Sequence, residues 1–394
     1  MNTIKIHRIT SIDLLRGCIM IIMALDHTRE YFSTDAFLFD PLDLSKTNVL
    51  MYFTRWITHF CAPIFVLLAG TSAFISGQRK TKKELAGFLV KRGLWLIFLE
   101  LTVVNFSWFF NFRFSFILLA VIWTLGVCMI CLAGLLFLPR KIIFVIGILL
   151  VASHNLLDQI HYPENNAMGF FWGLLHDQKF FTIGNLHMLL GYPIIPWIGV
   201  MALGYCLGGL FTNRYSVAER KRLLLLMGTG SILLFIMLRS INLYGNILPW
   251  SSQPSPIMTF LSFINISKYP PSLDYVLVTE GFALIFLGLT ESISNDLTKI
   301  ISVYGRVPLF YYLIHIYLIH LLAIVGASLS GFKWTDMIGF DNWIDYIPSL
   351  KGYGFSIGIV YLVWMSVVIA LYPLCKMYDN YKSSHKEKWW LSYL

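Results

Sequence analysis

Ionisable side chains stand at both ends of the first apolar stretch, which reads SIDLLRGCIMIIMALDHTREYF. Asp13 and Arg16 are spaced i, i+3 and can pair on one face of a helix. Asp26 and His27 follow about 15 to 17 Å further along the same helix. One helix thus carries a cation at one end and a titratable base at the other. An interfacial ion pair and a helix terminus among lipid headgroups would also explain these residues.

Histidines recur near the expected outer ends of other apolar stretches. His59 precedes Pro63 in THFCAPIFVLLAGTSAF and is expected in the same layer as His27. His187 is expected to open a later helix, and His154 to lie near the end of another. A lone histidine in a span is more often a hydrogen-bonded packing residue than a catalyst, and this applies most to His315 and His320, which fall deeper.

A third polar group comprises Glu100, Arg239 and Glu280, which are also predicted to lie at membrane depth. A buried carboxylate is either kept neutral or paired with arginine. Arg239 could therefore neutralise Glu280 or bind an anionic group of a substrate. The same residues could instead form the proton relay of a transporter.

The elements that position these residues follow from composition. The 394 residues are 57% hydrophobic and 13% charged, which excludes a soluble enzyme, a disordered chain and a secreted disulfide scaffold. At about 20 apolar residues per crossing, we predict an all-α polytopic membrane protein of about ten transmembrane helices, forming one domain over 1–394. The predicted helices cover 11–32, 55–77, 88–110, 114–138, 141–157, 187–211, 223–243, 273–291, 307–328 and 354–378.

The basic residues predict the orientation of these helices. With both termini in the cytoplasm, 21 of the 30 Lys and Arg residues fall on the cytoplasmic side, including Lys5, Arg8 and Arg16, as the positive-inside rule requires. The net charge of +9 then reflects sidedness and attraction to anionic lipid, so no nucleic acid partner is expected. Cys128 and Cys131 lie one helical turn apart on an apolar helix, which favours packing over metal or redox chemistry, and no metal is expected.

Five segments, taken together, resemble a known family. They are the first stretch, THFCAPIFVLLAG, YPIIPWIGVMALGYCLG, KYPPSLDYVLVTEG and GRVPLFYYLIH. They are similar to bacterial membrane proteins grouped with the catalytic domain of heparan-α-glucosaminide N-acetyltransferase. The resemblance is strongest over 8–320. It implies a multi-pass protein of the bacterial cytoplasmic membrane.

The wider superfamily of transmembrane acyltransferases shares an Arg, ten residues and then a His on its first helix, and Arg16 and His27 reproduce this spacing. The resemblance implies that both act in acyl transfer from cytoplasmic acyl-CoA to a sugar on the far side. His27, beside Asp26, would be the general base or would accept the acyl group. Arg16, paired with Asp13, would hold a CoA phosphate or the thioester.

One feature departs from the family pattern. The catalytic histidine of the heparan enzyme lies in the loop after its first helix, whereas this chain has no histidine between Thr28 and Thr58. His27 and His59 bracket the gap, and either could replace it.

The leading hypothesis is an integral membrane acyltransferase that moves an acetyl or other acyl group from acyl-CoA to an envelope glycan or similar acceptor. Acetyl-CoA is the expected co-substrate. The expected partners are the lipid bilayer, acyl-CoA, the acceptor and a second copy in a homodimer. The alternative is a transporter or exporter that uses the Glu, Arg and His residues at membrane depth.

Overall fold

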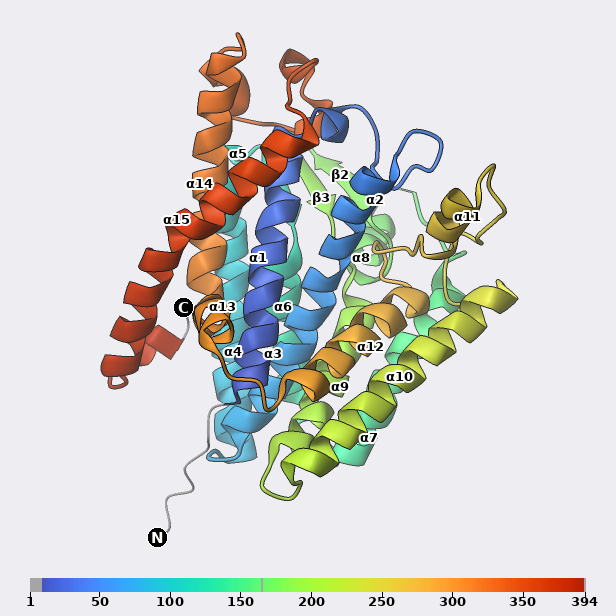
Figure 1. The fold of residues 1–394 in the computed structure, drawn as a ribbon, viewed down its shortest axis with the longest axis vertical. Helices are drawn as coiled ribbons and strands as arrows, with labels where there is room; N and C mark the ends of the chain where they lie inside the picture. Colours follow the sequence, from blue (N-terminus) through green and yellow to red (C-terminus); the bar gives the residue numbers. More distant parts are fainter. Residues whose placement is uncertain (1–8, 164–165, 393–394) are drawn as a thin grey trace.

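The computed structural model describes residues 9–163 and 166–392, so Lys5 and Arg8 lie outside the described residues. The chain is mostly helical, with one small sheet at one end of the helical body (Figure 1). The helices are α1 (Thr10–Phe32), α2 (Val49–Trp56), α3 (Cys61–Gly77), α4 (Lys82–Leu99), α5 (Asn105–Phe109), α6 (Val121–Leu135), α7 (Arg140–Ser153), α8 (Ala167–Leu175), α9 (Ile194–Leu207), α10 (Val217–Ile241), α11 (Pro256–Phe263), α12 (Leu273–Thr290), α13 (Asp296–Arg306), α14 (Pro308–Leu329) and α15 (Ile357–Ser384). The strands are β1 (Phe116–Leu119), β2 (Lys179–Ile183) and β3 (Leu186–Leu190).

The predicted helical membrane class is confirmed in outline. Within the described residues, 7 helical segments are long and apolar enough to cross a membrane. They are Val49–Gly77, Arg140–Leu157, Ile194–Phe211, Val217–Ile241, Leu273–Thr290, Pro308–Leu329 and Ile357–Ser384. The first helix, α1, is not among them, because Asp13, Arg16 and Asp26 distribute charge along its length, and α6 is a shorter apolar helix. The count of ten crossings and the cytoplasmic termini stay predictions.

Two predicted helix starts are wrong. The helices expected over 114–138 and 187–211 begin only at Val121 and Ile194, because the residues before them form β1 and β3. A run of four or five apolar residues has no periodicity that separates a buried strand from a helix. β3 pairs in parallel with β1 and antiparallel with β2, so the strands satisfy one another's backbone groups.

The helix α1 lies at the centre of the bundle and packs closely on α13 (Figure 1). A Cβ atom at Gly17 would lie 2.1 Å from the carbonyl oxygen of Ile301, and one at Gly305 would lie 1.9 Å from that of Asp13. Only glycine permits such an approach of two backbones. This contact fixes the Gly305 carbonyl beside Arg16.

The buried side chain of Glu100 holds the start of α6. Glu100 opens a π-helical stretch, Glu100–Val104, between α4 and α5. Its carboxylate accepts hydrogen bonds from the backbone N–H groups of Ala120 at 3.3 Å and Trp123 at 3.1 Å. A carboxylate at a helix N-terminus satisfies free donors there, so Glu100 serves as a cap for α6.

Candidate functional site

A cavity of about 260 Å³ opens at the N-terminal end of α1. We call it the Arg16 cavity. Its charged lining residues are Arg16, Arg92, Arg306 and Lys382. Most of the other lining residues are apolar, among them Met20, Leu89, Leu96, Leu125 and Met129. Four cations together with an otherwise mostly apolar lining, which we call the apolar shaft, suit a ligand with an anionic head and an apolar tail.

Arg16 is held in place from three sides. Its guanidinium donates to the carbonyl oxygen of Gly305 and to the hydroxyl of Ser72, each at 3.1 Å. Asp13 lies 3.6 Å away on the same helix, which confirms the predicted i, i+3 pair. Because Asp13 contacts Arg16, its carboxylate can orient the guanidinium.

A second cavity, of about 550 Å³, opens at the other end of α1. We call it the His27 cavity. Its ionisable lining residues include Asp26, His27, Arg29, Arg55 and Lys268. Aromatic side chains also line it, among them Trp108, Tyr192, Tyr269, Tyr312, Trp343 and Tyr346.

The tautomer of His27 follows from its hydrogen bonds. Nδ1 of His315 lies 2.9 Å from the Tyr311 carbonyl oxygen, which can only accept, so this nitrogen carries the proton. Nε2 of a neutral His315 is then an acceptor, and Nδ1 of His27, 2.7 Å away, donates to it. The Nε2 atom of His27 is thereby left unprotonated. This chain of bonds gives His27 the form that a general base requires.

The two cavities have two lining residues in common, Val121 and Tyr312. Tyr312 is buried, and its ring centre lies 6.1 Å from that of His27. Val121 begins α6, and only Ala120 separates it from the β1 strand. Arg16 and His27 therefore line separate cavities that adjoin at Tyr312 and Val121.

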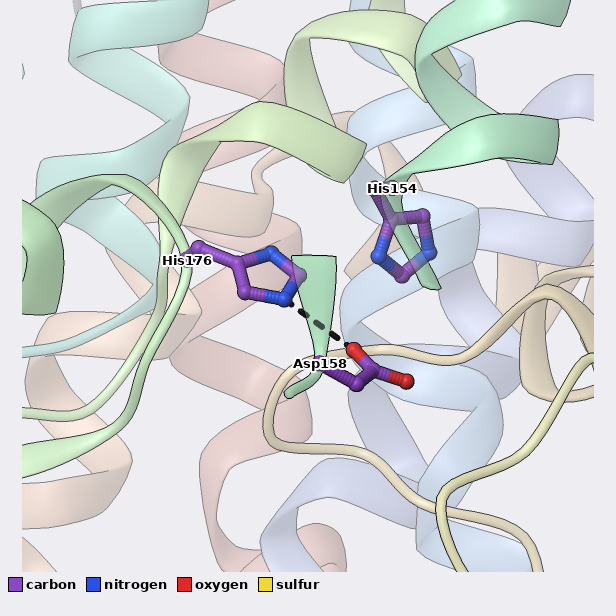
Figure 2. Close-up of side chains that lie close together, drawn as sticks. All are labelled: His154, Asp158 and His176. Atoms are coloured by element: carbon purple, nitrogen blue, oxygen red, sulfur yellow. Dashed lines mark hydrogen bonds and ion pairs between the residues drawn. The ribbon is translucent and has the colours of Figure 1, made fainter. Parts of the chain in front are cut away.

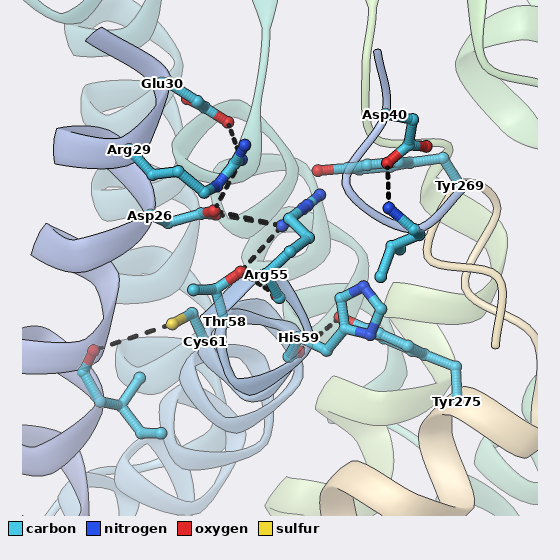
Figure 3. A network of polar contacts seen from close by, with 12 residues as sticks. Asp26, Arg29, Glu30, Asp40, Arg55, Thr58, His59, Cys61, Tyr269 and Tyr275 are labelled. Carbon is cyan, nitrogen blue, oxygen red and sulfur yellow. Dashed lines mark hydrogen bonds and ion pairs between the residues drawn. The ribbon is translucent and has the colours of Figure 1, made fainter. Parts of the chain in front are cut away.

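Asp26 belongs to a buried ionic network (Figure 3), whereas the side chain of His27 is hydrogen-bonded to His315. Its carboxylate accepts from Arg29 at 3.2 Å and from Arg55 at 3.2 Å. Arg55 also donates to the Thr58 hydroxyl at 2.8 Å. The network ties α1 to α2, and the two arginines line the His27 cavity.

His59 is buried and is not among the residues that line the His27 cavity. It faces a neighbouring cavity that Arg239 also lines. Neither ring nitrogen has a hydrogen-bond partner among the described residues, and the ring packs on Tyr275 with centres 5.5 Å apart (Figure 3). Of the two candidate histidines, only His27 combines a fixed tautomer with a position next to the Arg16 cavity.

The structure does not bring Glu100, Arg239 and Glu280 together. Arg239 donates to four backbone carbonyl oxygens, those of Leu248, Ser262, Phe263 and Asn265, at 2.8 to 3.1 Å. Both carboxylate oxygens of Glu280 lack a hydrogen-bond partner among the described residues. Of the two roles considered for Arg239, neutralisation of Glu280 is therefore not seen among the described residues.

Replacing Arg239 with leucine should destabilise the protein, since four buried or partly buried backbone carbonyl oxygens would lose a donor. We expect a loss of about 3 kcal/mol and a melting temperature about 5 to 10 °C lower in detergent. Arg214→Leu, which removes an exposed arginine, is the matched control and should melt like the wild type. A normal melting temperature for Arg239→Leu would contradict the bracing role.

The sequence predicted that His187 opens a helix, and this prediction is wrong. His187 lies in β3. It is exposed, and its Nδ1 atom lies 3.1 Å from the Thr182 hydroxyl. It lines a separate pocket with Asp341 and Asn342 rather than the His27 cavity.

Sequence reasoning missed His315, Lys268 and Tyr312 as residues of the site. His315 lies deep in its helix, and this depth suggested a residue that serves only in packing. Its hydrogen bond to His27 instead links α14 to α1. Lys268 is buried in the wall of the His27 cavity, with its ammonium 5.2 Å from the centre of the Tyr269 ring. Its position in the loop after α11 left no periodic signal. Buried aromatic positions such as Tyr312 are too common in a membrane chain to be singled out.

Comparison with known proteins supports the resemblance drawn from the sequence motifs. A search of curated proteins found no match. The family described as heparan-alpha-glucosaminide N-acetyltransferase, catalytic, matches residues 8–244, which include Arg16, His27 and His59 but not His315. Because this match covers more than half of the chain, the protein belongs to the heparan-alpha-glucosaminide N-acetyltransferase catalytic family.

Proposed function

We propose that the protein is a membrane acyltransferase that takes an acetyl group from acetyl-CoA on the cytoplasmic side and transfers it to a sugar or related acceptor on the outer side. The observation that carries this proposal is the pair of adjoining cavities. One has a basic lining and an apolar shaft, the other contains a histidine prepared to act as a base, and Val121 and Tyr312 line both. Family membership supports the chemistry.

The Arg16 cavity suits the donor. The phosphates of coenzyme A would lie near the cations Arg92, Arg306 and Lys382, and the apolar shaft would take the pantetheine arm. Arg16 lies on α1 about 16 Å from His27, at 1.5 Å per residue, and an extended pantetheine arm spans a comparable length. The cytoplasmic location of this end follows from the positive-inside distribution of Lys and Arg.

The reaction proposed at His27 is a single displacement. Nε2 of His27 takes a proton from an acceptor hydroxyl or amine, whose oxygen or nitrogen attacks the thioester carbonyl carbon. The carbon–sulfur bond breaks, and the thiolate of coenzyme A leaves and takes up the proton from His27. The products are the acetylated acceptor and free coenzyme A. His315 is a positioning residue that keeps Nδ1 of His27 as the donor.

The His27 cavity suits a sugar acceptor. Rings such as Trp108, Trp343 and Tyr269 line it together with charged groups, and sugars are bound by stacking on aromatic faces and by hydrogen bonds to their hydroxyls. The centre of the Trp108 ring lies 4.8 Å from that of His27. A sugar stacked in this cavity would present its reacting group near the base.

The first experiment tests the donor and the direction of transfer. Membrane vesicles of both orientations are given radiolabelled acetyl-CoA, which does not cross membranes, with glucosamine or isolated envelope glycan as acceptor. We expect labelled product only when acetyl-CoA has access to the cytoplasmic face. If the purified wild-type protein neither binds nor hydrolyses acetyl-CoA, the proposal is wrong.

The role of Arg16 gives a second test. Arg16→Ala should weaken acetyl-CoA binding about 10- to 100-fold, the range for a lost hydrogen bond to a charged group. Ser72→Ala is the matched control, since it removes a partner of Arg16 without removing charge, and should change binding less than about threefold. Equal affinities in titrations of wild type and Arg16→Ala would exclude Arg16 as a donor contact.

A further inference from the structure

Three side chains away from both cavities converge in a pattern typical of metal ligands. His154 and Asp158 flank the turn that ends α7, and His176 directly follows α8 (Figure 2). One potential ligand atom from each lies within 4.8 Å of the other two. Nε2 of His176 and Oδ1 of Asp158 are 3.0 Å apart. We call these residues the His154 cluster.

The hydrogen bonds leave this cluster incomplete. His154 is 1% exposed and His176 2% exposed. Among the described residues, no hydrogen-bond partner is found for either ring nitrogen of His154 or for Nδ1 of His176. The backbone of Pro271 lies beside His154 without forming a regular hydrogen bond. Buried polar atoms of native proteins are usually satisfied, so a buried imidazole with two unused nitrogens beside a carboxylate points to a ligand.

The surroundings of the cluster resemble an outer ligand shell. Nδ2 of Asn155 donates to Oδ2 of Asp158 at 2.8 Å, which orients the carboxylate and leaves its other oxygen toward His176. Oδ1 of Asn155 accepts from the backbone N–H of Leu273 at 2.9 Å. Ligands of bound metals are commonly held by hydrogen bonds of this kind.

We propose that His154, Asp158 and His176 bind a divalent transition-metal ion of the zinc class. Two imidazoles and one carboxylate favour zinc over magnesium or calcium, which prefer oxygen ligands. Ligand atoms about 2.0 to 2.2 Å from zinc lie roughly 3.3 to 3.6 Å apart in a tetrahedral site. The His176 and Asp158 atoms already have nearly this separation, and a small shift of the His154 ring would complete the arrangement. A water molecule would fill the fourth position.

The position of the cluster assigns the ion a structural role. It would join the end of α7 to the end of α8 and, through Asn155, to the start of α12. Gln178 and Lys179, which follow His176, line the His27 cavity. A metal ion here would therefore fix the segment that forms one wall of that cavity. This role does not depend on the reaction proposed at His27.

The test measures metal in the protein itself. Wild type and variants are purified without chelator from zinc-supplemented cells and analysed by plasma mass spectrometry. We expect about one zinc ion per wild-type chain and less than about a tenth in His154→Ala and Asp158→Ala. His161→Ala is the matched control, because His161 is an exposed histidine of the same region that pairs with Asp177, and it should keep its zinc.

A second measurement covers variants that fail to fold. Stripping the wild-type protein with a chelator should lower its melting temperature, and zinc sulfate at about 100 times the dissociation constant should restore it by about 5 °C. Cobalt in place of zinc should give the visible absorption of a tetrahedral site. A wild-type protein that contains no metal, and whose melting temperature zinc sulfate does not change, would overturn the proposal.

Discussion

Replacing His27 with alanine should reduce acetyl transfer by about 10²- to 10⁴-fold, the range expected for loss of a general base. Acetyl-CoA affinity should change less than about twofold, because His27 lines the acceptor-side cavity and not the Arg16 cavity. Product formation and donor binding are measured on the same purified protein. The loss should therefore appear in kcat and not in donor binding.

Two other histidines serve as controls for this result. His187→Ala removes an exposed histidine on β3 and should leave transfer unchanged. His59→Ala removes a buried histidine of a neighbouring cavity. It should lower the free energy of unfolding, while kcat per folded molecule should change little. If His59→Ala abolished transfer while His27→Ala did not, the base would have to be reassigned to His59.

Replacing His315 with phenylalanine should lower kcat by roughly 10²- to 10⁴-fold although His315 need not touch either substrate. The variant removes the acceptor of the His27 Nδ1 proton, and a donor left unpaired inside the protein is costly. His27 would then mainly adopt the tautomer in which Nε2 is protonated and cannot act as a base. Loss of tautomer control has costs of this order in catalytic triads. The measurement is kcat at saturating acetyl-CoA, together with KM.

A conservative substitution and a double mutant separate tautomer control from packing. The amide oxygen of glutamine can accept the same proton, so His315→Gln should recover much of the lost rate. Combining His315→Phe with His27→Ala should cost no more than His27→Ala alone, because both act through one group. If the two losses multiplied instead, His315 would have a separate role.

Hydropathy predicted where the long helices lie, because a run of about 20 apolar residues forms few structures other than a membrane-spanning helix. It failed at β1 and β3, whose sequences FILL and LHMLL are as apolar as the helices that follow them. The choice between strand and helix depends there on pairing between segments some 70 residues apart. Single-sequence patterns carry no information about such a partner.

The candidate site was predictable only where its residues share one helix. The spacing of Arg16 and His27 suggested both, because it matches the pattern of the acyltransferase superfamily that the sequence resembles, and the i, i+3 rule predicted the Asp13 pair. The bond between His27 and His315 joins residues 288 positions apart, and no local pattern indicates it. For Arg239, its type and depth suggested an ionic role, whereas its partners proved to be backbone carbonyls of the neighbouring loop.

The adjoining of the two cavities also bears on permeability. Val121 and Tyr312 line both cavities, so in the proposed orientation they would form the layer that separates the cytoplasm from the outer side along this path. The thioester of the donor has to reach across this layer, but protons and ions must not cross it. A selective pore likewise has to pass one species and exclude others. A pantetheine arm that fills the Arg16 cavity would close the path during each transfer. Ions could therefore leak chiefly in the interval after one coenzyme A has left and before the next acetyl-CoA binds.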